Sequence, residues 1–195
     1  MNSIGKDNSV RGAAKGLIDA IARFDADHDT EALRRGILDS TRPLLERADL
    51  LSLGGKRQAN HIDNSRYLYY DGELSVTIDE FPQGKSIPPH DHGVWEAIVV
   101  VRGRLEHCVY RRVDDGTVEG HAQLRITEDV ELTAGDVTMV VPPNDIHSFK
   151  ALVPDTFVIT VVGGEYSPTR RYFRLDDNTY AVKTPRALRE SGALA

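Results

Sequence analysis

Two histidines lie one residue apart in the stretch PPHDHGVWE, residues 88–96. Alternate residues of a strand point to the same face, so His90 and His92 can reach one point inside a sheet or barrel. Glu96 follows His92 by an even offset and joins that face if the strand continues without a bulge. His147 begins a later strand-like run. Three imidazoles and a carboxylate suit a first-row divalent ion such as Fe(II), Mn(II), Ni(II), Cu(II) or Zn(II).

Each of these side chains also has a simpler interpretation. A histidine taken alone is more often a turn residue or a hydrogen-bonded core residue than a metal ligand. The alternative for Glu96 is a place behind the ligands, where it accepts a ring N–H. The combined spacing favours a metal bound by His90, His92 and His147, with Glu96 as the fourth candidate ligand. A thiolate site is excluded, since Cys108 is the single cysteine.

The elements that would position these residues are short strands. Segments rich in β-branched and aromatic residues run from RYLYYD at residue 66 to TYAVK at residue 179, separated by Gly, Pro, Asn and Asp. Many short strands at near-regular spacing are typical of a sandwich or barrel, not of a βαβ fold. We therefore predict a mainly β protein.

A helical pattern precedes the strands, from Val10 to Leu53. Apolar residues recur there at helical spacing on two stripes, and DADHDT at residues 25–30 divides them. Pro43 interrupts the second stripe, which predicts a kink or two short helices. We expect an N-terminal helical segment over residues 1–58, a barrel over 59–185 and a tail over 186–195.

Composition limits the classes of function. The 195 residues carry a formal net charge of −6 and no basic run, which argues against nucleic acid or an anionic membrane as a partner. No apolar stretch has the length of a membrane span, and the N-terminal residues lack the apolar core of a signal peptide. We expect a cytoplasmic protein whose partner is a small molecule, with pairing of edge strands into a homodimer left open.

The glycine and histidine spacing resembles that of the cupins. Gly84, His90, His92, Glu96 and Gly103 match every position of the first cupin motif. The second motif is recognisable in Gly135, Pro142 and His147, although Asn144 stands where glycine is usual and His147 comes one residue late. The resemblance covers roughly residues 60 to 175 and implies a double-stranded β-helix, the jelly-roll barrel of that superfamily.

Within the cupins, the chain is most similar to bacterial cysteine and 3-mercaptopropionate dioxygenases. PPHDHGVWE and PPNDIHS resemble two stretches of that group, and Arg66 falls near its carboxylate-binding arginine. The alternative for Arg66 is a surface salt bridge. The resemblance implies a non-haem Fe(II) dioxygenase that takes O2 and a small thiol or carboxylate, with Mn, Ni, Cu and Zn as other possible metals.

Several residues depart from that group. Val158, Thr160 and Val162 stand where it has a Ser-x-His-x-Tyr motif, and Glu96 replaces a small residue. Two alternatives therefore stay open: a non-oxidative metal-dependent lyase, isomerase or decarboxylase, and a metal-dependent binding cupin without turnover. We predict His90, His92, Glu96 and His147 as metal ligands, and Arg66 and Glu96 as residues that act on the substrate.

Other polar residues have weaker signals. His107 and His121 are interpreted as ordinary strand residues. Arg170 and Arg171 follow the GGEYSPT loop, where a structural ion pair is the simpler interpretation and anion binding the alternative.

Overall fold

A computed structural model describes residues 7–57, 62 and 64–192. Its core is two antiparallel sheets of six strands each. The first has the order β1 (Gly55–Lys56), β2 (Asn64–Tyr70), β3 (Leu74–Phe81), β10 (Thr156–Gly163), β5 (Trp95–Arg102) and β8 (Val137–Val140). The second has the order β12 (Thr179–Lys183), β11 (Arg170–Arg174), β4 (Ser86–His90), β9 (Ile146–Ala151), β6 (Arg104–Arg112) and β7 (Leu124–Thr133).

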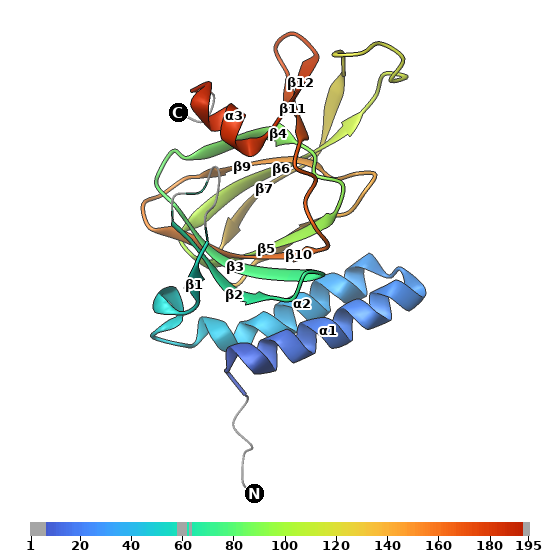
Figure 1. Cartoon of the computed structure of the whole chain (residues 1–195). Coiled ribbons are helices and arrows are strands. Elements are labelled where there is room, and N and C mark those ends of the chain that lie inside the picture. Colours follow the sequence, from blue (N-terminus) through green and yellow to red (C-terminus); the bar gives the residue numbers. More distant parts are fainter. Residues whose placement is uncertain (1–6, 58–61, 63, 193–195) are drawn as a thin grey trace, which may run out of the picture.

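The chain passes repeatedly from one sheet to the other. From β3 to β6 each strand lies in the sheet opposite its predecessor, and the same alternation resumes from β8 to β11. The strands thereby wind into a double-stranded β-helix whose two sheets face each other (Figure 1). The predicted mainly β jelly-roll barrel with an N-terminal helical segment is confirmed.

Two helices cover the outer face of the first sheet. Ser9 is the N-cap of α1 (Val10–Asp27), and its side chain accepts from the Gly12 N–H. Asp29 is the N-cap of α2 (Thr30–Leu45), and its side chain accepts from the Ala32 N–H. The two helices lie below the barrel in Figure 1. Their apolar side chains pack on the outer face of the first sheet. The predicted break between the helices is therefore present.

Pro43 does not divide the second helix, so the predicted alternative of two short helices is wrong there. The proline lies in the last turn of α2, which ends at Leu45. Proline has no N–H to donate to the carbonyl four residues earlier, so the last turn forms with one helical hydrogen bond fewer. A separate 3₁₀ turn, Leu50–Ser52, follows.

The helices explain why β5 is apolar on both faces. Trp95, Ala97 and Val99 pack outward in the cluster shared with the helices, whereas Ile98 and Val100 point into the barrel. Successive strand residues alternate between faces, so Glu96 points inward with Ile98. This parity places a buried carboxylate in the barrel interior.

The sequence predicted segment boundaries after residue 58 and after residue 185. The expected boundary between residues 58 and 59 falls on residues outside the described part of the chain. A short helix, α3 (Pro185–Glu190), occupies the start of the expected tail. Within the described residues, no helix has the length and apolar character needed to cross a membrane.

Ile37 tests the packing of the helices on the sheet. Its side chain is fully buried at 0% exposure in the cluster between α2 and the barrel. Ile37→Ala should lower the free energy of unfolding by about 2–5 kcal/mol, since it removes buried methyl groups and leaves a cavity. Urea unfolding measures the change. Ile18→Ala on the exposed side of α1 is the control, and equal losses in both variants would contradict the packing.

Candidate metal centre

His90 and His92 lie at the end of strand β4 and just beyond it. His90 is the last residue of β4 and pairs with His147 of β9 across the second sheet. His92 lies beyond the strand, in the turn that leads to β5. The expectation that His90 and His92 share a strand face is thus wrong, because β4 ends before His92. The turn conformation brings the second imidazole to the first.

Asp145 holds this turn in place. Its carboxylate oxygen Oδ2 accepts from the backbone N–H groups of His92 at 3.1 Å and of Gly93 at 2.8 Å. Gly93 has a φ of 73°, a left-handed conformation that glycine adopts without strain. Asp145 lies two residues before His147, so one short segment both supplies a candidate ligand and fixes the turn that supplies another.

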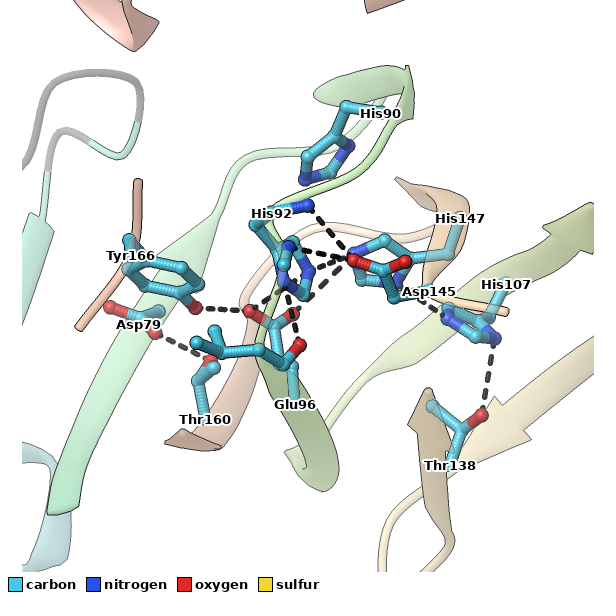
Figure 2. A network of polar contacts seen from close by, with 12 residues as sticks. Asp79, His90, His92, Glu96, His107, Thr138, Asp145, His147, Thr160 and Tyr166 are labelled. Carbon is cyan, nitrogen blue, oxygen red and sulfur yellow. Dashed lines mark hydrogen bonds and ion pairs between the residues drawn. The ribbon is translucent and has the colours of Figure 1, made fainter. Parts of the chain in front are cut away.

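The three imidazoles converge on one point. One ring nitrogen from each of His90, His92 and His147 lies within 4.8 Å of the other two, and the Nε2 atoms of His92 and His147 are 3.1 Å apart. All three residues are buried, and Figure 2 shows their rings close together. Burial, together with repulsion from the neighbouring imidazoles, holds the pKa of His147 well below its usual value. The histidine is thereby kept neutral, the form that binds metal.

Hydrogen bonds direct the correct nitrogens inward. His90 Nδ1 lies 2.9 Å from the Pro88 carbonyl oxygen, and His92 Nδ1 lies 3.0 Å from that of Val94. A carbonyl only accepts, so each Nδ1 carries the hydrogen and each Nε2 keeps its lone pair. This is the arrangement that a metal-binding imidazole requires.

His147 is oriented by a chain of buried polar groups. Its Nδ1 lies 3.0 Å from His107 Nε2, and His107 Nδ1 lies 3.1 Å from the Thr138 hydroxyl. Burial lowers the pKa of His107 to about 4, so this ring is neutral and can accept the Nδ1–H of His147. His107 was interpreted from the sequence as an ordinary strand residue. Its inward position follows from the parity it shares with buried Leu105.

Glu96 lies beside the imidazoles. Its two carboxylate oxygens are each 3.7 Å from an imidazole Nε2, one from that of His92 and the other from that of His147. The Tyr166 hydroxyl donates to Glu96 Oε2 (Figure 2). Burial and the charge of Glu96 raise the pKa of Tyr166 well above its usual value, so the phenol keeps its proton. Three imidazoles and one carboxylate fit a divalent first-row ion.

A cavity opens beside this cluster, with an empty volume of about 650 Å³ that includes its mouth. Its polar wall contains Arg57, Asp79, His90, Glu96, Thr160, Tyr166 and Arg170, and its apolar wall contains Ile62, Phe81, Ile98, Leu105, Phe149, Val158 and Pro185. A small molecule bound there would contact both charged groups and the candidate metal site.

Arg170 is the unusual cation of this wall. It is 7% exposed, and its guanidinium lies 4.3 Å from the centre of the Tyr166 ring. Its Nε is buried and has no hydrogen-bond partner among the described residues. A buried N–H without a partner is costly, which fits a site that an anion completes.

Arg66 lies elsewhere. Its Nε donates to the Leu53 carbonyl at 3.0 Å, and it lines a separate pocket with Lys56 and Asn64. Strand parity gives the reason: neighbouring Ser65 points inward to Asp79, so Arg66 points to the other face. The structure therefore does not bring the predicted carboxylate-binding residue to the site.

Tyr166 and Asp79 were missed from the sequence for different reasons. Tyr166 lies in the loop after β10, where no periodicity predicts which way a side chain points. Asp79 lies on β3 between Ile78 and Glu80, and its even spacing from Thr77 and Phe81 predicts that it shares their face. Alternation within SVTIDEF was therefore a usable signal for Asp79.

No protein-family model matches the sequence, and no curated protein matches it. Among solved structures, KdgF from Halomonas sp. aligns with a TM-score of 0.43 and 21% identity over 58% of this chain and 90% of its own. A cupin superfamily protein from Desulfitobacterium hafniense gives 0.41 and 18% over 62% and 93%. Hydroquinone 1,2-dioxygenase PnpCD, in complex with Cd²⁺ and 4-hydroxybenzonitrile, gives 0.40 and 11% over 51% and 63%. Similarity at this level carries no information about chemistry.

His92 tests the centre directly. His92→Ala should remove most of the bound first-row metal, because two imidazoles and a carboxylate hold an ion far more weakly than the full set. Metal content per chain, measured by plasma mass spectrometry after dialysis, gives the result. His121→Ala, outside the cluster, is the control and should keep its metal. Full retention in His92→Ala would reject the site.

His107 tests the orienting chain. His107→Leu should weaken metal binding about 10- to 100-fold, since the Nδ1–H of His147 loses its acceptor. Competition with a chromophoric chelator measures the affinity. Cys108→Ser, the adjacent residue on the opposite face of β6, is the matched control. Equal affinity in the His107 variant and the native protein would show that His107 does not orient His147.

Proposed function

We propose that the protein is a metal-dependent enzyme, a non-haem Fe(II) dioxygenase of small thiol or carboxylate molecules. One observation carries the proposal: one ring nitrogen from each of three buried histidines lies within 4.8 Å of the other two, and His90 lines an open cavity beside them. A metal site alone would also suit a metal-binding protein without turnover. The cavity adds charged side chains beside the histidine cluster. Such a site both binds and positions a small molecule.

The metal would be held by His90, His92 and His147, with Glu96 as a further oxygen ligand. Fe(II) bound there would activate O2 beside the substrate, which itself would supply the electrons that O2 accepts. Glu96 as a ligand would leave fewer positions on the ion for substrate and O2 than three imidazoles alone. The hydrogen bond from Tyr166 occupies Oε2 of Glu96, so a Glu96 that binds the ion would be shared between the ion and the phenol.

Arg170 would bind the acidic group of the substrate. It would take the role that the sequence suggested for Arg66, because Arg170 lines the same cavity as His90 and Glu96 and has a buried Nε without a hydrogen-bond partner among the described residues. The ring of Tyr166 restricts the guanidinium from one side. Phe81, Phe149 and Ile98 form apolar walls that exclude water around the bound molecule.

A non-oxidative metal-dependent lyase or isomerase is the second candidate. The specific observation in its favour is the pair Glu96 and Tyr166, a carboxylate and a phenol in hydrogen-bond contact beside the candidate metal. Such a pair can exchange a proton with a substrate that the ion polarises. Turnover without O2 in protein loaded with Mn(II), Ni(II) or Zn(II) would favour this candidate.

The proposal is tested with Fe(II)-loaded protein, cysteine and 3-mercaptopropionate. Oxygen uptake should accompany formation of the sulfinate. Arg170→Ala should then raise KM by about 10- to 150-fold, since a charge-assisted hydrogen bond in a desolvated pocket contributes roughly 1.5–3 kcal/mol. Arg66→Ala is the matched control and should leave KM unchanged. An effect of Arg66 and none of Arg170 would reverse the assignment, and absence of oxygen uptake with either thiol would reject a thiol substrate.

A further inference from the structure

A second carboxyl group lies in the wall of the cavity, on β3. Asp79 is 1% exposed, and its Oδ2 accepts from the hydroxyls of Thr77 and Thr160, both at 2.7 Å. The Ser65 hydroxyl donates to Oδ1. No cation hydrogen-bonds to Asp79 within the described chain. A buried carboxylate without a cationic partner is costly, so its position in the same cavity wall as His90 and Glu96 suggests a function.

The hydroxyl partners of Asp79 are not equivalent. Thr160 lines the cavity together with Asp79, whereas Thr77 and Ser65 are absent from the cavity wall. A molecule in the cavity can therefore contact the Thr160 hydroxyl, while the other two hydroxyls serve only to hold the carboxyl group.

We propose that Asp79 and Thr160 form a proton-exchange pair that faces the molecule bound in the cavity. When Asp79 is ionised, the Thr160 O–H donates to it. A ligand O–H or S–H can give its proton to the Thr160 oxygen as Thr160 passes its own proton to Asp79. The ligand keeps the electron pair and gains a negative charge, and Asp79 becomes a neutral acid that donates to Thr160. The reverse transfer restores both groups.

The surroundings favour exchange at this carboxyl. Burial raises the pKa of Asp79, against the opposing effect of the three hydroxyls and the charge of Arg57. Besides Asp79, the ionisable residues that line the same cavity are Arg57, His90, Glu96, Tyr166 and Arg170. A neutral Asp79 leaves the Thr160 O–H free to donate to the ligand, so the charge state of Asp79 decides whether Thr160 accepts or donates.

The inference rests on the proposed function only in taking this cavity as the substrate site, and two measurements keep them separate. The first is infrared titration of protein labelled with ¹³C-carboxyl aspartate, where Asp79→Asn identifies the Asp79 band. We expect Asp79 to titrate above the usual range of an aspartate. An Asp79 that stays ionised at every pH where the protein is folded would overturn the pair.

The second measurement counts protons when 3-mercaptopropionate binds Zn(II)-loaded protein, by calorimetry in buffers of different ionisation enthalpy at a pH above the Asp79 midpoint. The native protein should retain the thiol proton. Asp79→Asn and Thr160→Val should each release about one more proton per site. Thr77→Val is the matched control, since Thr77 makes the same contact to Asp79 but lies outside the cavity wall, and it should retain the proton.

Each outcome decides between the claims. Equal proton release in the native protein and in Thr160→Val would overturn the exchange pair, even if both bind the thiol. Loss of retention in Thr77→Val as well as in Thr160→Val would assign Asp79 a structural role instead. If 3-mercaptopropionate does not bind, the thiol substrate is rejected and the infrared titration alone decides the pair. Thr160→Val also serves if Asp79→Asn fails to fold.

Discussion

The constraint on which the structure depends is the cost of burying a polar group without a partner inside the barrel. His90, His92 and His147 sit in an interior where an unpaired ring N–H is costly. Each outer nitrogen meets this demand with a backbone carbonyl or with His107. The Nε2 atoms of His92 and His147 lie beside each other and beside the carboxylate of Glu96. Satisfaction on the outside and lone pairs on the inside together make a site that a divalent ion completes.

The scaffold around the site depends on the burial of apolar surface. The outer face of the first sheet is apolar and would be exposed without α1 and α2, whose leucines and isoleucine cover it. With that face covered, β3, β5 and β10 can use their inward positions for Asp79, Glu96 and Thr160. Asp145 serves the second sheet similarly, since it fixes the turn that carries His92. The helices α1 and α2 thus stabilise the wall of the cavity without contributing a side chain to it.

Periodicity predicted only some of the strand residues of the site, since Asp79, His107 and Thr160 also lie on strands and were not predicted. The parity of β5 places Glu96 inward, and the glycine and histidine spacing singled out the three imidazoles. Turns and loops were beyond this reasoning: β4 ends before His92, and Tyr166 approaches Glu96 from a loop. Arg66 was assigned by resemblance, but the parity of Ser65 turns it away. Arg170 could be placed only once the cavity was known, because burial without a partner is a three-dimensional property.

The central claim is that one metal ion is held by His90, His92 and His147, with Glu96 beside them. Anomalous X-ray diffraction from crystals of protein loaded with Fe(II) under anaerobic conditions tests it most directly. The account predicts one strong peak per chain at about 2.0–2.2 Å from the three Nε2 atoms. A cluster without a peak, or a peak bound only by residues outside this cavity, would contradict it.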